Sequence, residues 1–355
     1  MKPAASPIDW ERAERVALGV ATRRPAPSFT ITGPPHASPT QVEDQIEQVT
    51  GLRSANGTAV VQLIDRQTWI RANIASFRTL LTPVMDRWQQ KTGSSSATAV
   101  FARRITGIEV GALLGWMSTR VLGQYDLLIG RDTGDEMGDD AVYLVGSNLA
   151  MLEQRYSFDP HEFRTWVLLH ELTHRAQFTG VPWMRTYFTG LVQESLSFAD
   201  PDPKVLLEAL RAALRDRRHA GQHVRDGGVL GLLAAPDQRA VMARIGGLMS
   251  LLEGHGDVTM TRAAGELAPN AERFERILRE RRRTANPLSR AVMRLAGIEA
   301  KLNQYAAGER FITAIEAEAG DRAVDRCWQG AEQLPTLEEI RAPRTWLARM
   351  EAAVA

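Results

Sequence analysis

The sequence has few of the features that mark secreted or membrane proteins. Its 355 residues include a single cysteine, Cys327, which excludes an intrachain disulfide and favours a reducing compartment. The longest apolar run, Val110 to Met117, is far too short to span a bilayer. Residues 1–24 have neither the apolar core nor the cleavage site of a signal peptide. We therefore expect a cytoplasmic protein that does not bind membranes.

The sequence also has no excess of either charge. Its 43 basic and 42 acidic residues nearly cancel, so no preference for nucleic acid or for a charged membrane surface is expected. It has no Gly-x-Gly-x-x-Gly motif and no phosphate-loop lysine, which argues against a nucleotide site. A hydrophobic content of 44% is enough for a sizeable core. The oligomeric state does not follow from the sequence.

The chain is expected to be mainly α, with a small β element (an α+β fold). Residues 1–40 read as a short helix at 8–22 and a proline-rich arm, and residues 41–355 as one mostly helical domain. The other helices are expected at 40–50, 66–91, 98–122, 160–180, 203–218, 236–262, 270–283, 286–317, 320–328 and 344–354. Gly107, Gly111 and Gly115 recur every four residues, which predicts a tightly packed core helix.

Two β segments are expected before the helix at 160–180. They are Tyr125–Ile129 and Ala141–Val145, separated by an acidic, glycine-bearing turn. An edge strand beside a metal-binding helix can pair with an extended substrate as an added strand. We hypothesise that one of these two segments has that role. A structure in which both were buried far from His170 would exclude it.

The sequence HELTH at 170–174 indicates a zinc site. A helix repeats every 3.6 residues, so His170 and His174 lie one turn apart on the same face and can reach one metal ion. Glu171 lies beside them, where it can take a proton from water and act as the catalytic residue. Asp159 and Pro160 have the residue types of a helix start, and Glu162 stands where the carboxylate of a capping box belongs.

A catalytic zinc site needs at least a third protein ligand, with the fourth position left to water. Gln177 stands in the stretch after the motif where a third histidine would be sought, so a carboxylate is expected instead. Glu194 and Glu253 are the two candidates. Glu194 reads equally well as an exposed or helix-capping residue. For His255 we expect a role in lining the cleft or supporting a ligand rather than binding the metal directly.

Several segments together resemble the zincin-like metallopeptidase type 2 family of bacterial zinc hydrolases. They are WVLLHELTHRAQFTGVPWMR, MSLLEGHGDVTM, KLNQYAAGERFI and LPTLEEIRAP, and the resemblance runs from Ile8 to Leu347. It implies a mostly helical zincin-like core that binds Zn²⁺. Some members of this family are labelled as associated with the biosynthesis of a deazaflavin coenzyme, but the residues of these segments give that label no chemical support.

The resemblance also bears on the remaining ligand. The segment Leu-Leu-Glu-Gly-His-Gly-Asp is similar to the segment of gluzincin peptidases whose glutamate is the third zinc ligand, which favours Glu253. Gly254 and Gly256 would let this helix approach the metal helix closely. The interval to Glu194 is also typical of gluzincins, so Glu194 stays the alternative. Tyr305 is a candidate for lining the cleft, as tyrosines do in gluzincins, although a packing role is expected.

We therefore expect a zinc-dependent, metallopeptidase-like hydrolase that acts on a peptide or another amide bond. Aminopeptidase specificity is not expected, because the chain has no Gly-x-Met-Glu-Asn motif. The alternative is a catalytically silent zincin-like scaffold or regulatory binding protein, since a complete ligand set is necessary for hydrolysis but not sufficient.

Overall fold

The computed structural model describes residues 8–25, 27, 37–92, 97–127, 140–198, 236–283 and 298–352. The side chains of residues 83–92, 97–104, 236, 282–283 and 298–306 lie outside this description. The fold is mainly α with a small three-stranded sheet, which confirms the expected class. The chain divides into two compact units. The first unit contains Met1–Gln45, Asn56–Arg175 and Ala264–Ala271, and the second contains Ile46–Ala55, Ala176–Ala263 and Glu272–Ala355.

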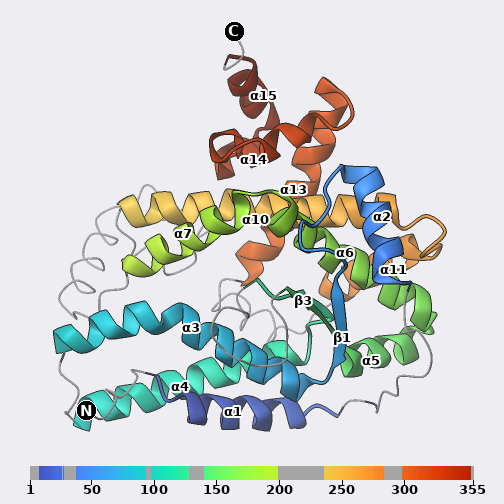
Figure 1. The fold of residues 1–355 in the computed structure, drawn as a ribbon. Coiled ribbons are helices and arrows are strands. Elements are labelled where there is room, and N and C mark those ends of the chain that lie inside the picture. Colours follow the sequence, from blue (N-terminus) through green and yellow to red (C-terminus); the bar gives the residue numbers. More distant parts are fainter. Residues whose placement is uncertain are drawn as a thin grey trace. The chain divides into compact units, whose positions relative to one another are not determined.

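The first unit contains the sheet and most of the N-terminal helices (Figure 1). Its elements are α1 (Trp10–Thr22), α2 (Pro39–Thr50), β1 (Val60–Ile64), α3 (Arg66–Thr92), α4 (Ala97–Ser118), β2 (Gly123–Tyr125), β3 (Ala141–Val145), α5 (Gly146–Tyr156) and α6 (Pro160–Gly180). Boundaries between the units fall inside α2, α6 and α11 (Ala271–Arg283), so each unit contains a part of these helices.

The sheet has the order β1-β3-β2, with β1 parallel and β2 antiparallel to the central β3. All five residues of β3 are buried, as expected for a strand covered on both faces. Burial, together with the nearby charge of Asp126, raises the pKa of Tyr143 on β3 to about 12, so its hydroxyl stays protonated. On β2, Gln124 exchanges amide hydrogen bonds of 3.2 and 3.3 Å with Asn73 of α3.

The glycine spacing of α4 has the structural cause that the sequence predicts. Figure 1 shows α1 lying along α4. A Cβ atom at Gly107 would lie 2.6 Å from the carbonyl oxygen of Asp9, and one at Gly111 would overlap the backbone of Ala13. Only glycine allows the two backbones to approach this closely.

The second unit is built around one long helix, α10 (Pro236–Ala263). The other elements are α7 (Met184–Ser197), α11 (Ala271–Arg283), α13 (Ile298–Ala319), the 3₁₀ segments η1 (Ala323–Trp328) and η2 (Ala331–Gln333), α14 (Leu337–Arg341) and α15 (Pro343–Ala352). Helix α10 packs against α7, α13 and α14, and Figure 1 shows α7 beside it. The expected helix at 203–218 and the expected segment 286–297 lie outside the described residues.

Several boundaries differ from the sequence-based expectation. Helix α4 ends at Ser118 rather than near 122. Here the side-chain N–H groups of Asn148 donate hydrogen bonds to the carbonyl oxygens of Ser118 and Val121, at 2.7 and 2.6 Å. Strand β2 covers residues 123–125, and residues 128–129 of the expected strand lie outside the described part. Strand β1 and helix α5 were not predicted. The expected helix at 320–328 is a 3₁₀ segment that follows Arg322, whose φ is 64°.

Within the part of the chain that the structure describes, no helix combines the length and the apolar character that a bilayer crossing requires.

Candidate metal centre

Helix α6 presents the two histidines of the HELTH motif. The helix begins where the sequence predicts, with the Asp159 carboxylate accepting a 2.9 Å hydrogen bond from the backbone N–H of Glu162. The carboxylate of Glu162 accepts from the backbone and side-chain N–H groups of Asn270, a use that the sequence did not indicate. The Nε2 atoms of His170 and His174 lie 3.1 Å apart, and their rings are nearly perpendicular, at 84°. Both nitrogens therefore converge on one point.

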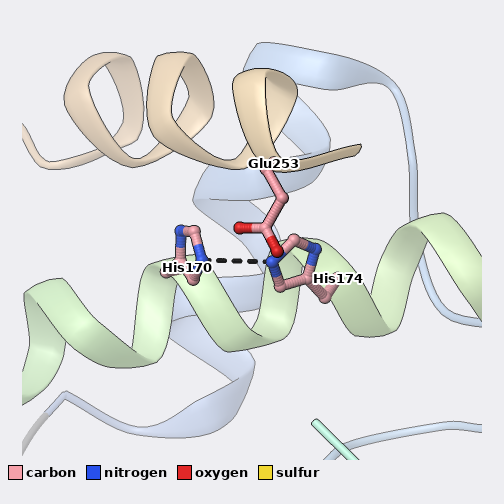
Figure 2. A group of neighbouring side chains, drawn as sticks. All are labelled: His170, His174 and Glu253. Atoms are coloured by element: carbon pink, nitrogen blue, oxygen red, sulfur yellow. Dashed lines mark hydrogen bonds between the residues drawn. The ribbon is translucent and has the colours of Figure 1, made fainter. Parts of the chain in front are cut away.

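Glu253 on α10 completes a group of three potential ligands. One ligand atom from each of His170, His174 and Glu253 lies within 4.8 Å of the other two (Figure 2). All three side chains are partly buried. Figure 2 shows the Glu253 carboxylate pointing from α10 toward the two imidazole rings. Among the described residues, these three side chains form the group of potential metal ligands that lie close enough together to share one ion.

The donor set fits a zinc ion. Two nitrogen ligands at about 2.0–2.1 Å from one zinc ion, in tetrahedral arrangement, lie about 3.3 Å apart, close to the 3.1 Å between the two Nε2 atoms. Two imidazoles and one carboxylate are also the protein ligands of catalytic zinc sites that keep their fourth position for water. Without a metal ion, the same spacing lets one neutral imidazole donate a hydrogen bond to the other.

The carboxylate of Glu171 is held against strand β2. Its Oε2 accepts a 2.9 Å hydrogen bond from the backbone N–H of Tyr125, and its side chain is almost fully buried. A Cβ atom at Gly123 would lie 2.7 Å from both Cγ and Oε1 of Glu171. The carboxylate thus occupies the space that any larger residue at position 123 would fill.

The turn that leads into β2 is fixed by buried polar contacts. Asn148 donates to the carbonyl oxygens of Ser118 and Val121, and it accepts a 2.7 Å hydrogen bond from Nε of Arg66. These contacts pair the backbone oxygens at the end of α4 that would otherwise be buried without a donor. They hold the chain just before Gly123 in a defined conformation.

The sheet topology assigns the two predicted β segments different roles. Strand β3 is central and has a neighbour on each side, so it cannot accept an additional strand. Strand β2 is an edge strand and lies against Glu171. In the antiparallel ladder, Leu122 and Asp126 bond to β3, so the backbone N–H and C=O groups of Gly123 and Tyr125 point away from it. The edge-strand hypothesis therefore narrows to β2.

Buried ion pairs fix α6 next to the motif. The guanidinium of Arg175, directly after His174, pairs with Asp140 and Glu43, and all three side chains are buried. Asp140 has a φ of 86° and immediately precedes β3. Removing one partner from such a cluster is costly, because it leaves buried charge without compensation. This cluster fixes α6 to α2 and to the residue that precedes the central strand β3.

The remaining predicted site residues lie elsewhere. Glu194 on α7 forms an exposed ion pair with Arg244, at 2.7 Å. His255 on α10 is buried, and its Nδ1 is 2.9 Å from the side-chain nitrogen of Gln177. Tyr305 belongs to α13, in the part whose side chains the structure does not describe. A Cβ atom at Gly254 would overlap the backbone of Gly308, so this glycine allows a close approach to α13.

Sequence reasoning missed Gly123, the Tyr125 N–H and Gln177 as parts of this site. A glycine at the start of a strand can mark a close approach of another group, which was the available signal for Gly123. Gln177 lies seven residues after His170 and so shares the helical face of the histidines. The backbone N–H of Tyr125 has no sequence signal.

Comparison with known proteins shows the family of the chain. The model of the family of zincin-like metallopeptidases matches residues 8–347, and no match was found among curated proteins. The chain is similar to a protein from Chloroflexus aurantiacus, described as a candidate hydrolase with a novel fold, with 30% sequence identity and a TM-score of 0.69. The match covers 97% of this chain and 99% of that protein. The family model spans nearly the whole chain, which therefore belongs to the zincin-like metallopeptidase family.

Proposed function

We propose that this protein is a zinc-dependent hydrolase that cleaves a peptide or another amide bond, with its ion held by His170, His174 and Glu253. The observation that carries the proposal is the convergence of these three side chains, with Glu171 one residue from the first ligand. A Zn²⁺ ion bound there would polarise a carbonyl group and lower the pKa of a water molecule toward about 7.

Glu171 is the proposed general base. Its carboxylate takes a proton from the attacking water and later gives it to the leaving amine, so the same group acts as base and then as acid. The hydrogen bond from the Tyr125 N–H fixes the carboxylate on the β2 side of the helix. A fixed carboxylate needs little reorganisation during the reaction, which is the advantage of a preorganised site.

Strand β2 is the proposed alignment surface for the substrate. The backbone N–H and C=O groups of Gly123 point away from β3, and the strand lies beside the proposed general base, which accepts a hydrogen bond from the Tyr125 N–H. An extended chain that adds to this edge would place its own backbone near Glu171. This arrangement favours a peptide over a compact small-molecule amide.

The experiment combines zinc analysis with a cleavage assay. Bound zinc is measured by elemental analysis, and hydrolysis is followed with a library of internally quenched fluorescent peptides and a set of simple acyl amides. Glu171→Gln should keep its zinc and lose roughly 10²- to 10⁴-fold in hydrolysis, which is the usual contribution of a general base. Glu253→Gln should bind zinc more weakly, because it removes an anionic ligand.

Glu194→Gln is the matched control. Its carboxylate is exposed and paired with Arg244, so both zinc content and hydrolysis should stay at the wild-type level. Hydrolysis at the wild-type rate by Glu171→Gln would contradict the assigned base. A wild-type protein that binds zinc and cleaves none of these substrates would instead support the catalytically silent scaffold.

A further inference from the structure

Gln177 makes two hydrogen bonds to α10, and they flank the third ligand. Its side chain is fully buried, and its Nε2 atom lies 3.1 Å from the carbonyl oxygen of Leu252 and 2.9 Å from Nδ1 of His255. Glu253 stands between these two contacts in the sequence. The amide thus holds the backbone of α10 at the turn that carries the Glu253 carboxylate.

The hydrogen-bonding roles follow from the partners. A backbone carbonyl can only accept, so the NH₂ end of the Gln177 amide faces α10. The Nδ1 atom of His255 therefore accepts the second hydrogen bond, which leaves the proton of the neutral ring on Nε2. The indole of Trp328 contacts this imidazole edge-on, with 4.9 Å between ring centroids. His255 is held from two sides and serves as a fixed acceptor.

The opposite side of α10 is fixed by a backbone contact with α13. A Cβ atom at Gly254 would overlap the backbone of Gly308, and one at Gly308 would overlap the carbonyl of Ser250. At such a glycine crossing, α10 cannot approach α13 more closely. The hydrogen bonds from Gln177 add a second fixed contact on α10, at the turn that carries Glu253.

We propose that Gln177 is a positioning residue for the metal centre, which holds α10 so that the Glu253 carboxylate faces the histidine pair. The proposal rests on the metal centre of the proposed function. Gln177 lies one turn beyond His174 on the same helix, so the distance between the imidazoles and the Gln177 amide is fixed by helix geometry. The same helix thereby carries the two histidines and the group that is proposed to orient Glu253.

The test is a double-mutant cycle on zinc affinity. Gln177→Met keeps nearly the same side-chain length and removes the donor. Zinc affinity is measured by competition with a chromophoric chelator for the wild type, Gln177→Met, Glu253→Ala and the double variant. Gln177→Met should bind zinc roughly 10- to 100-fold more weakly, the usual effect of removing a group that orients a ligand. In the Glu253→Ala background, the same change should have no further effect on affinity.

The cycle separates positioning from a general loss of structure. A merely structural role of Gln177 would weaken zinc binding equally with and without Glu253, and equal losses would overturn the proposal. So would a folded Gln177→Met variant with wild-type affinity. Gln193→Met, an exposed change of the same kind on α7, is the control and should leave affinity unchanged.

The zinc affinities of His255→Ala and Glu253→Ala provide two further tests. Should Gln177→Met not fold, His255→Ala removes only one of the two contacts, and its zinc affinity should lie between those of the wild type and Glu253→Ala. Wild-type affinity in His255→Ala would then overturn the proposal. Unchanged affinity in Glu253→Ala, or no zinc binding by the wild type, would refute the metal centre itself and the proposed function with it.

Discussion

Replacing Gly123 by alanine tests whether the Glu171 carboxylate must occupy its observed place. The added Cβ atom would lie 2.7 Å from Cγ and Oε1 of Glu171 and 2.9 Å from its Cδ. Favourable contacts between carbon atoms begin at about 3.5 Å, so the carboxylate must move by roughly 0.8 Å. The φ angle of Gly123 is not in the left-handed region, so alanine adds no backbone strain of its own.

A displacement of this size should lower turnover strongly. Misplacing a catalytic group by about 1 Å costs on the order of 10²-fold, so we expect a 10- to 100-fold loss in kcat/KM, or about 1.4–2.7 kcal/mol in the barrier. Zinc affinity should stay within about threefold of the wild type, because Glu171 is not one of the three convergent ligands. The assay uses the fluorescent peptide that the wild type cleaves best, with zinc affinity measured in parallel.

Two matched glycine variants control for the substitution itself. A Cβ atom at Gly19 of α1 or at Gly190 of α7 would meet nothing within 4 Å. Gly19→Ala and Gly190→Ala should therefore keep full activity and gain up to about 1 kcal/mol in free energy of unfolding, because alanine is the better helix former. A Gly123→Ala variant with wild-type kcat/KM would show that this close contact does not position the proposed general base, Glu171.

Two more predictions concern stability and reactivity. Arg175→Met leaves two buried carboxylates without their shared cation, so it should lower the free energy of unfolding, measured in urea, by about 3–5 kcal/mol. As a control, Arg71→Met breaks an exposed pair with Glu14 and should lower it by at most about 1 kcal/mol. Equal effects of the two substitutions would contradict the expectation for Arg175. Burial raises the pKa of the Cys327 thiol, so less thiolate is present at pH 8. A disulfide reagent should modify Cys327 much more slowly in the native protein than in guanidinium, and equal rates would show that the thiol is accessible.

Local features of the site could be predicted because they depend on short stretches of chain. The i, i+4 spacing of His170 and His174 alone brings their nitrogens together once the segment is helical. The helix start at Asp159 and the buried strand at 141–145 also follow from residue types within a few positions. The end of α4 could not be predicted in this way, since the carbonyl oxygens of Ser118 and Val121 bond to Asn148, which is distant in sequence.

The sequence by itself determined that a helix presents two imidazoles and a glutamate in an order suited to zinc, and it gave two acidic residues as candidates for a third ligand. Only the tertiary structure shows that a ligand atom of Glu253 lies within 4.8 Å of those of the two histidines, while Glu194 pairs with Arg244 on the surface. It also decided that Gly123 and the Tyr125 N–H receive the Glu171 carboxylate. The physical reason is that helix periodicity acts over one turn, whereas contacts between distant residues depend on how whole elements pack.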